Sequence, residues 1–541
     1  MSVLLIGATL APLLLLLVAC SWRASRPAVL AWLPVAPLPA LAVALPPLFG
    51  PPLSLALPSL RISLILDLPG AMLLGVSALL WSVAGIWAAT FLRSNGFSLR
   101  FVGSWLLTLS GSVGVFMAAD LLSFYLLFAL ASLPAYGLIA HDDDARGHRA
   151  GSVYMAFTIL SEAFLLMGFV LLAAGDLTSS VQIGDVMAAL PRSPWRDGAM
   201  AFTAAGFVLK VGLVPMHGWM PVAYAAAPIP AAAVLSGAGV KAGVIGFIRF
   251  LPFDAAMPLA GELLVALGLL SAFYGVVVGI TQSNPPTVLA YSSVSQMGVI
   301  AATLGMGLAS GDSGTALAGA FYAAHHVLAK GALFLAVGVI ATSATERRRP
   351  TLILATLVAL GLAGLPLTGG ALAKLAIKEP LGEGLVGMLS ILSAIGTTVL
   401  MVHFIVRIAR TAEPSTSVAP GPDFLLPWRI IALAAIGVPW LLYPVGGGDL
   451  IGAFAPGALL DAAWPVAIGV VLALALIKWG DRLPRIAAGD VVVPMERAFH
   501  AGASLGAIVE RLDGQLRQWP AATLSLVLIA VALTASVVLG R

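Results

Sequence analysis

The sequence contains little charge and almost no cysteine. Of its 541 residues, 10% are Asp, Glu, Lys or Arg and 60% are hydrophobic, whereas about 25% of an average soluble protein is charged. So few charges cannot cover the surface of soluble domains of this total length, and that class of protein is excluded. The single cysteine, Cys20, excludes disulfide frameworks, iron–sulfur clusters and cysteine-based zinc sites. We expect no metal and no cofactor in this chain.

Long apolar runs are what the sequence does contain. A membrane span needs about 20 apolar residues, and the runs are continuous where a β-barrel would alternate. We therefore expect an all-α polytopic membrane protein with about 14–16 transmembrane helices. The candidate spans lie near residues 3–20, 27–48, 70–92, 101–119, 121–140, 152–174, 199–217, 229–250, 258–281, 287–307, 315–342, 351–378, 383–407, 427–443, 463–477 and 521–540.

Arginine and lysine are distributed unequally between the loops. Loops after odd-numbered spans, together with the stretch before the last span, carry 18 of the 28 basic residues, and loops after even-numbered spans carry 4. Because cytoplasmic loops are enriched in Lys and Arg, we expect the odd loops in the cytoplasm and the N-terminus outside. The first apolar run lacks a basic leader, and we expect a retained helix there and not a signal peptide.

Of the six basic residues that remain, Arg541 ends the chain. The other five are lysines at membrane depth: Lys210, Lys241, Lys330, Lys374 and Lys378. A charge at the centre of a membrane helix costs about 2.5–3.5 kcal/mol. Such lysines are expected to face the protein interior or a hydrated path. For Lys378 a second interpretation stays open, in which the side chain reaches the surface from a misplaced helix end.

Two of the predicted helices are expected to be broken. Pro215 follows Lys210 by five residues, with His217 inside the break, and Pro366 precedes Lys374 in a second break that contains two glycines. Irregular backbone at membrane depth is tolerated only inside protein or against a water-filled cavity. A broken helix beside a buried amine is therefore typical of a transport site.

The two breaks lie five spans apart, which suggests two inverted five-helix repeats. The chain then divides into N-terminal helices at 1–100, a first repeat at 101–250, a second repeat at 258–407, and C-terminal helices at 411–541. Within the last part, residues 491–512 mix apolar and charged positions and predict a short amphipathic surface helix.

The remaining polar residues of the spans suggest a proton relay. His326 and Lys330 lie four residues apart on one helical face, and histidine titrates close to physiological pH. Glu162 lies in the middle of a span, where no helix cap explains it, and we expect it to partner Lys210. Asp67 lies at the mouth of a span, and we expect it to be a helix cap. Further relay candidates are His217, His325, His403, Asp120 and Ser236.

These segments resemble the antiporter-like membrane subunits of respiratory complex I and its relatives. That superfamily includes subunits L, M and N of NADH-quinone oxidoreductase, the large subunits of multisubunit Na+/H+ antiporters, and membrane subunits of hydrogenase-4 and formate hydrogenlyase. The resemblance covers about residues 60–410 and is strongest in the Lys210-to-Lys241 segment, LAYSSVSQMG (289–298), HHVLAKGALF (325–334) and AGLPLTGGALAK (363–374). It implies a fourteen-helix core of two inverted five-helix units, an external N-terminus and a bacterial inner membrane.

The resemblance also assigns roles to the lysines and the histidine. Lys210 takes the place of the lysine in the first broken helix, Lys241 that of the bridging lysine, and Lys374 that of the lysine after the second break in subunit-L-like members. His326 and Lys330 match the central pair.

Two positions depart from the family pattern. Ala129, in LLFALASLPAY (126–136), stands where members usually carry a glutamate, and Gln296 stands where a histidine is common. Glu162 falls where some subunit-L-like members have an acid, so the resemblance makes it the substitute for the missing glutamate.

The function that follows is a proton or cation/proton translocating subunit of a membrane complex related to complex I. Its expected partners are other membrane subunits, the lipid bilayer and protons or Na+, with no nucleic acid. The chain lacks a dinucleotide motif and a cysteine set, so it performs no redox chemistry alone and would be one part of a redox-driven proton translocase. Three alternatives stay open: a subunit of a multisubunit Na+/H+ antiporter, an ion-coupled partner in inorganic-carbon uptake, and a structural subunit that has lost transport.

Overall fold

The computed structural model describes residues 3–57, 62–175, 180–342, 345–410, 422–479 and 486–498. The chain forms two units, Met1–Ala488 and Gly489–Arg541. The second unit is described only over residues 489–498, of which 492–498 are helical. This helix falls within the predicted amphipathic segment, whose remainder lies outside the described residues. The predicted last span, 521–540, lies outside them as well.

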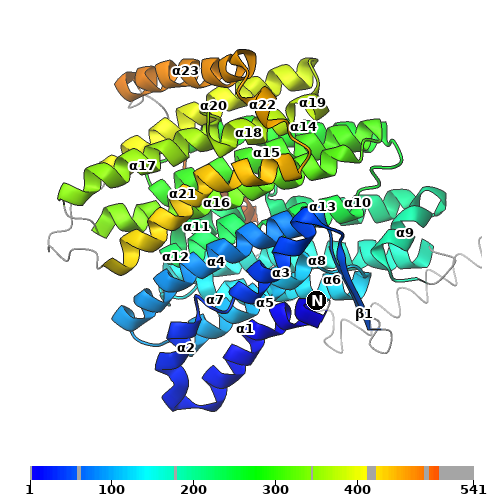
Figure 1. Ribbon diagram of the computed structural model, residues 1–541, viewed down its shortest axis with the longest axis horizontal. Coiled ribbons are helices and arrows are strands. Elements are labelled where there is room, and N and C mark those ends of the chain that lie inside the picture. Colours follow the sequence, from blue (N-terminus) through cyan, green and yellow to red (C-terminus); the bar gives the residue numbers. More distant parts are fainter. Residues whose placement is uncertain are drawn as a thin grey trace, which may run out of the picture. The chain divides into compact units, whose positions relative to one another are not determined.

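The first unit is built almost entirely of helices (Figure 1). Its N-terminal part contains α1 (Val3–Ser21), α2 (Arg26–Trp32), α3 (Leu38–Phe49) and α4 (Leu68–Asn95). The region of the first predicted repeat contains α5 (Leu99–Val115), α6 (Leu121–Ser132), α7 (Tyr136–Ile139), α8 (Ala145–Gly175), α9 (Ile183–Ala189), α10 (Arg196–Val211), α11 (Trp219–Ala226), α12 (Ile229–Val234) and α13 (Lys241–Phe250).

The region of the second predicted repeat contains α14 (Pro258–Gly279), α15 (Pro285–Ser310), α16 (Gly314–Thr342), α17 (Thr345–Ala363), α18 (Gly369–Ala376), α19 (Lys378–Leu381) and α20 (Leu385–Ala409). It is followed by α21 (Pro422–Val445), α22 (Leu450–Ala453) and α23 (Pro456–Trp479). The inverted relation of the two repeats stays a prediction.

Eleven helices among the described residues are long and apolar enough to cross a membrane. This confirms the expected polytopic all-α membrane protein. The expected span at 27–48 is instead divided into α2 and α3 by a turn over residues 33–37. Pro34 and Pro37 fall in this turn, and proline removes a helical N–H and clashes with the preceding turn. The prediction of one continuous helix there was wrong for that reason.

A short hairpin precedes α4 and was missed by the all-α expectation. Strand β1 (Leu53–Leu57) pairs antiparallel with β2 (Ile62–Leu66). The signal was partly present in the sequence, because LSLAL alternates large and small residues as a strand does, whereas ISLIL ends in three large apolar residues and does not alternate. The hairpin reaches the start of α6, since Ser63 N donates to Asp120 Oδ2 at 2.7 Å.

Both expected helix breaks are present. The helix α10 ends at Val211 and α11 starts at Trp219, and Gly212 between them has a φ of 69°. The helix α17 ends at Ala363 and α18 starts at Gly369, with a φ of 103° at Gly364. A residue with a Cβ is strained at such positive φ values, so glycine ends both helices.

Helix α16 lies in the interior of the first unit. It packs against α4, α15, α17 and α21 (Figure 1). In the apolar stretch that could cross the membrane, 94% of the residues of α16 and 100% of those of α15 are buried. The central parts of these two helices are thus shielded from lipid, and polar side chains there meet only protein or enclosed water.

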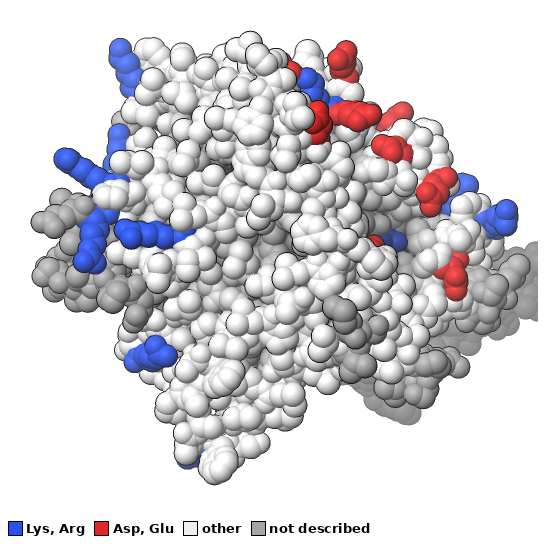
Figure 2. Space-filling model, viewed as in Figure 1, with Lys and Arg blue, Asp and Glu red and all other residues white. Residues whose placement is uncertain are grey.

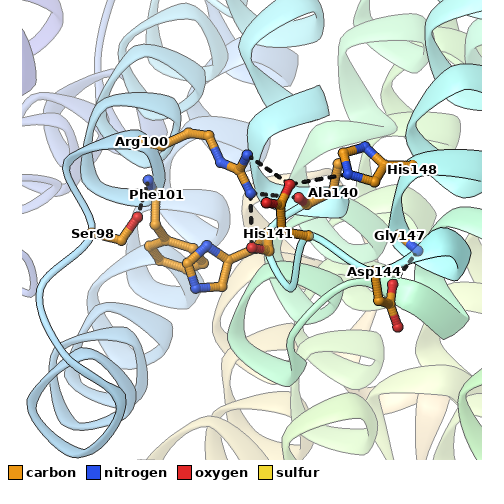
Figure 3. Close-up of polar contacts among 9 residues, drawn as sticks. Ser98, Arg100, Phe101, Ala140, His141, Asp144, Gly147 and His148 are labelled. Carbon is orange, nitrogen blue, oxygen red and sulfur yellow. Dashed lines mark hydrogen bonds and ion pairs between the residues drawn. The ribbon is translucent and has the colours of Figure 1, made fainter.

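The helix that carries Glu162 is anchored at its start by a polar turn (Figure 3). Arg100 donates to the carbonyl oxygens of Ala140 and His141 at 2.7 and 2.8 Å. Asp144 accepts from Gly147 N at 2.5 Å and caps α8. The ring of His141 packs edge-on against Phe101, and burial there lowers the pKa of His141 below its usual value.

Charged side chains gather at opposite edges of the molecule. Figure 2 shows lysine and arginine mainly at the left edge and aspartate and glutamate mainly at the upper right, with a few basic groups among them. The face between them is largely uncharged, as a surface covered by lipid requires.

Asp67 and Asp120 both cap helices at the ends of spans. Asp67 accepts from Gly70 N at 3.0 Å and pairs with Arg249, which confirms the expected cap. Asp120 is fully buried. Beyond its bond from β2, it accepts from the backbone N and the Oγ of Ser123, each at 2.7 Å. These contacts account for its burial, and its role in a relay stays a prediction.

We expect Asp120→Ala to destabilise the protein. The change leaves buried donors of β2 and α6 without their acceptor, which costs about 1–3 kcal/mol. Thermal unfolding of the purified protein in detergent measures the effect, and Asp197→Ala, at an exposed side chain, is the matched control. An unfolding midpoint equal to that of the control would contradict the assignment of Asp120 as a structural cap.

Candidate functional site: buried lysines and histidines

Helix α8, which carries Glu162, and helix α10, which carries Lys210, approach each other closely. A Cβ on Gly206 would lie 3.1 Å from the carbonyl oxygen of Ser161 and 2.6 Å from Leu165. Ser161 Oγ donates to the carbonyl of Gly206 at 2.8 Å. Lys210 follows Gly206 by one helical turn and Glu162 follows Ser161 by one residue, so the close contact places both charged groups at the same interface.

The amine of Lys210 is hydrogen-bonded to a hydroxyl and not to a carboxylate. Its Nζ donates to Ser132 Oγ at 2.6 Å and lies 5.2 Å from the centre of the Phe128 ring. Both residues belong to α6, the helix in which Ala129 replaces the family glutamate. Among the described residues, neither carboxylate oxygen of buried Glu162 has a hydrogen-bond partner. The pairing of Glu162 with Lys210 therefore stays a prediction.

A small cavity adjoins Lys210. Its volume is about 10 Å³, close to the minimum that one water molecule needs. Tyr154, Thr158 and Ser161 line it from α8, and Ser132 lines it from α6. Thr158 and Ser161 precede Glu162 on the same helix by four residues and by one, so the cavity lies between Lys210 and the part of α8 that leads to the carboxylate.

Lys241 and His326 form a direct contact in the interior. Lys241 Nζ lies 2.7 Å from His326 Nδ1, and both side chains are fully buried. When the lysine donates, Nδ1 accepts and the ring proton sits on Nε2. Within the described part of the chain, that Nε2 has no hydrogen-bond partner. The histidine can thus accept from one side and donate to the other.

The backbone before Lys241 is irregular. Residues Leu235–Gly239 form a π-helical turn between α12 and α13. A Cβ on Gly237 would lie 2.3 Å from the side chain of Leu80 and 3.1 Å from the carbonyl oxygen of Val327. The turn is therefore packed tightly between α4 and α16, which fixes Lys241 opposite His326. The sequence analysis missed this third irregularity, because no proline marks it.

Lys330 lies one turn beyond His326 and is bonded to a backbone carbonyl. Its Nζ donates to Leu289 O at 2.8 Å. Ser293 Oγ donates to the same oxygen at 3.2 Å and lies 3.1 Å from Ser236 Oγ. The carbonyl of Leu289 thus joins α16, α15 and the π-helical turn in one hydrogen-bonded cluster, in which Ser236 represents the π-helical turn.

His325 and Lys374 meet at the second break. Lys374 Nζ donates to the carbonyl of Ala363, the last residue of α17. A Cβ on Gly370 would lie 3.1 Å from His325 Cε1, so the imidazole rests on the start of α18. Neighbouring helical residues point about 100° apart. His326 therefore faces Lys241 while His325 faces the second break, and α16 connects the two regions.

The other predicted relay residues have different surroundings. His217, in the first break, packs edge-on against Tyr274, with ring centres 5.0 Å apart. His403 Nε2 lies 2.8 Å from the carbonyl oxygen of Gln282, in the turn after α14, and 3.4 Å from Nε of Arg407, one turn along its own helix. The structure does not bring His403 into contact with the lysines described above.

Lys378 is not a buried lysine. Its side chain is 58% exposed and its Nζ lies 2.6 Å from Asp461 Oδ2 in α23. The prediction that it lies in the interior was wrong, and the alternative of a side chain reaching the surface from a helix end is correct. Four buried or partly buried lysines remain, Lys210, Lys241, Lys330 and Lys374.

A neutral network beside the lysines was missed. Tyr322 Oη donates to Gln296 Oε1 at 2.7 Å, and Gln296 Nε2 donates to Thr397 Oγ1 at 3.1 Å. Tyr322, His326 and Lys330 are spaced four residues apart, so one face of α16 carries all three. That spacing was readable from the sequence, whereas the partners on α15 and α20 depend on the fold.

The fold and the buried basic residues define a class: a multi-pass helical membrane protein with ionisable side chains in its interior. The family described as "NADH:quinone oxidoreductase/Mrp antiporter, TM" matches residues 118–401, which is more than half of the chain. The chain belongs to this family.

Individual relatives align over shorter stretches. NADH-quinone oxidoreductase subunit N of Desulforudis audaxviator is 32% identical over 256 residues, which is 46% of this chain and 50% of the relative. Hydrogenase-4 component B of Escherichia coli is 29% identical over 306 residues, 54% of this chain and 44% of the relative. The chain thus spans about half the length of the curated relatives it matches.

Two solved structures share the fold. The structure of the Mrp complex from Dietzia sp. DQ12-45-1b has a chain that aligns with a TM-score of 0.76 at 22% identity, over 98% of this chain and 63% of that one. A chain of the archaeal membrane-bound sulfane sulfur reductase aligns with a TM-score of 0.68 at 18% identity, over 88% and 99%. At these identities the likeness establishes the fold.

Proposed function

We propose that this chain translocates protons across a bacterial inner membrane as one subunit of a larger membrane complex related to complex I. The observation that carries the proposal is the direct contact between Lys241 and His326 in the fully buried interior. A buried amine without a carboxylate is a costly group. Its retention beside an imidazole is explained when both groups exchange a proton.

The proposed path runs along the membrane plane through residues of both broken helices. Glu162 and Lys210 load the proton in the first half, and Lys241, His326 and Lys330 carry it across the centre. Lys374, at the second break, releases it. What supports this order is the position of α16, where His326 faces Lys241 and His325 rests on the second break. Asp120, His217, Ser236 and His403 stay secondary candidates.

Protons suit the proposed path better than sodium ions do. Sodium is bound by several oxygen ligands, which favour hard cations, whereas the groups in contact here are amines, an imidazole and single hydroxyl or carbonyl oxygens. A protonated amine would also repel a metal cation at the same position. Amines and imidazoles carry protons directly.

The proposed complex supplies what this chain lacks. The relatives are named as subunits or components of NADH-quinone oxidoreductase and of hydrogenase-4. We propose that other membrane subunits surround this chain, that the N-terminus lies outside, and that any redox groups belong to the partners.

We expect Lys241→Met to abolish proton uptake by the complex. The complex is isolated with its native partners, reconstituted into liposomes and assayed with a pH-sensitive dye. The variant should give the signal of empty liposomes, because methionine cannot pass a proton to His326. Lys378→Met is the matched control, since it also removes a lysine but at an exposed ion pair. Uptake by Lys241→Met equal to that of the control would overturn the proposed path.

Glu162→Gln tests whether Glu162 replaces the glutamate missing at Ala129. We expect it to slow proton uptake strongly, because glutamine keeps the size of the side chain but cannot bind and release a proton at neutral pH. Glu262→Gln, at an exposed position on α14, is the control. If uptake in Glu162→Gln matches that control, Lys210 works without the carboxylate and Glu162 is not part of the path.

A further inference from the structure

Helix α21 packs against α16, α17 and α18, and so against both sides of the second break (Figure 1). It follows the second predicted repeat and lies beyond residues 118–401, the part of the chain that the family covers. Trp428 of α21 is fully buried and donates from Nε1 to the carbonyl of Ala332 in α16 at 3.0 Å. This bond fixes the register of α21 along α16.

A proline in the interior of α21 leaves one backbone carbonyl without its regular helical donor. Pro439 has no N–H, so the carbonyl of Ala435, four residues earlier, receives no hydrogen bond from it. Both residues are buried. Trp428, Ala435 and Pro439 are spaced by seven and four residues and therefore share one face of the helix. The face that Trp428 holds against α16 thus also presents the carbonyl of Ala435.

The carbonyl of Ala435 and the ring of His325 meet at Gly369, the first residue of α18. A Cβ on Gly369 would lie 2.7 Å from His325 Cδ2 and 2.9 Å from Ala435 O, and it would clash with Pro439 Cγ. These three groups surround one point, and only a residue without a side chain leaves room for them. His325 and Ala332 are seven residues apart, so both lie on the face of α16 that α21 covers.

The imidazole of His325 turns its Nε2 corner toward the second break. Its Cδ2 lies close to Gly369, and a Cβ on Gly370 would lie 3.1 Å from its Cε1. Nε2 is the ring atom bonded to both of these carbons, so it lies toward the start of α18. The carbonyl of Ala435 is therefore on the side of the ring where an Nε2–H group could donate, directly or through one water molecule.

We propose that Pro439 is a positioning residue for proton release, because it makes the carbonyl of Ala435 available as an acceptor for Nε2 of His325. The proposal rests on the proposed function and adds a C-terminal helix to the path. The bond keeps the ring proton on Nε2 and leaves Nδ1 as the acceptor. Once Nδ1 has accepted a proton, Nε2 gives up its own to the neutral amine of Lys374, and the ring is neutral again.

Pro439→Ala tests the proposal, because alanine returns an N–H to α21 and engages the carbonyl of Ala435 within the helix. Pro444→Ala is the matched control, since Pro444 lies in the same helix and is exposed. The complex is isolated with its native partners from cells given 15N-labelled histidine, and His325→Gln assigns the NMR signal of His325 by difference. We expect the Nε2 resonance to shift in Pro439→Ala and to stay unchanged in the control. Pro439→Val, which returns the N–H but keeps most of the bulk, should shift it equally.

Proton uptake into liposomes is measured for the same variants. We expect Pro439→Ala and Pro439→Val to slow uptake about fivefold, the effect of one neutral hydrogen bond on an equilibrium, and Pro444→Ala to leave it unchanged. An unchanged resonance in Pro439→Ala, or a shift that Pro439→Val lacks, would overturn the proposed contact. A shifted resonance with unchanged uptake would overturn its role in release. The resonance is read without transport, so it tests the contact even if Lys241→Met leaves uptake intact and the proposed path fails.

Gly369→Ala reaches the same contact from α18. Its methyl group would stand between the ring of His325 and the carbonyl of Ala435, so we expect a shifted Nε2 resonance and slower uptake. Gly384→Ala is the control, because a Cβ there would meet nothing within 4 Å. Thermal unfolding in detergent shows that the variants compared are folded. A resonance in Gly369→Ala equal to that of its control would contradict the proposal independently of the proline variants.

Discussion

The cost of burying an amine in the membrane interior determines how this protein is built. Lys241 and Lys330 are fully buried and have no carboxylate among their hydrogen-bond partners in the described part of the chain. Each is held by one neutral acceptor, an imidazole nitrogen in one case and a carbonyl oxygen in the other. Single neutral partners lower the cost of the charge without fixing it, which leaves each amine able to gain and lose a proton.

Helix α16 is the element that makes a continuous path conceivable. Its face with Tyr322, His326 and Lys330 meets the π-helical turn and α15, and the adjacent His325 meets the second break. The second break supplies a carbonyl oxygen that a regular helix would use internally, that of Ala363, to Lys374. At the second break, irregular backbone thus provides an acceptor where a buried amine needs one, whereas Lys210 beside the first break is held by the hydroxyl of Ser132.

Sequence alone predicted the features that depend on local chemistry. Proline and glycine located both breaks, and the positions of Lys210 and Lys374 beside them followed from the order of residues. The cap at Asp67 was predicted because this residue lies just before the start of a predicted span. Features that depend on a partner far along the chain were not predictable: Ser132 as the acceptor for Lys210, Asp461 as the partner of Lys378, and Thr397 as the partner of Gln296. The period of two in β1 was readable but was hidden within an apolar composition, and the sequence of β2 carries no such period.

The central claim is that His326 passes a proton from Lys241 toward the second break, and the water structure around it tests this most directly. A cryo-electron microscopy map of the native complex, at a resolution that shows ordered water, would locate every acceptor near His326 Nε2. The account predicts a water hydrogen-bonded to Nε2, and further waters from it toward Lys330 or Lys374. A dry cavity closed by apolar side chains around Nε2 would contradict the account.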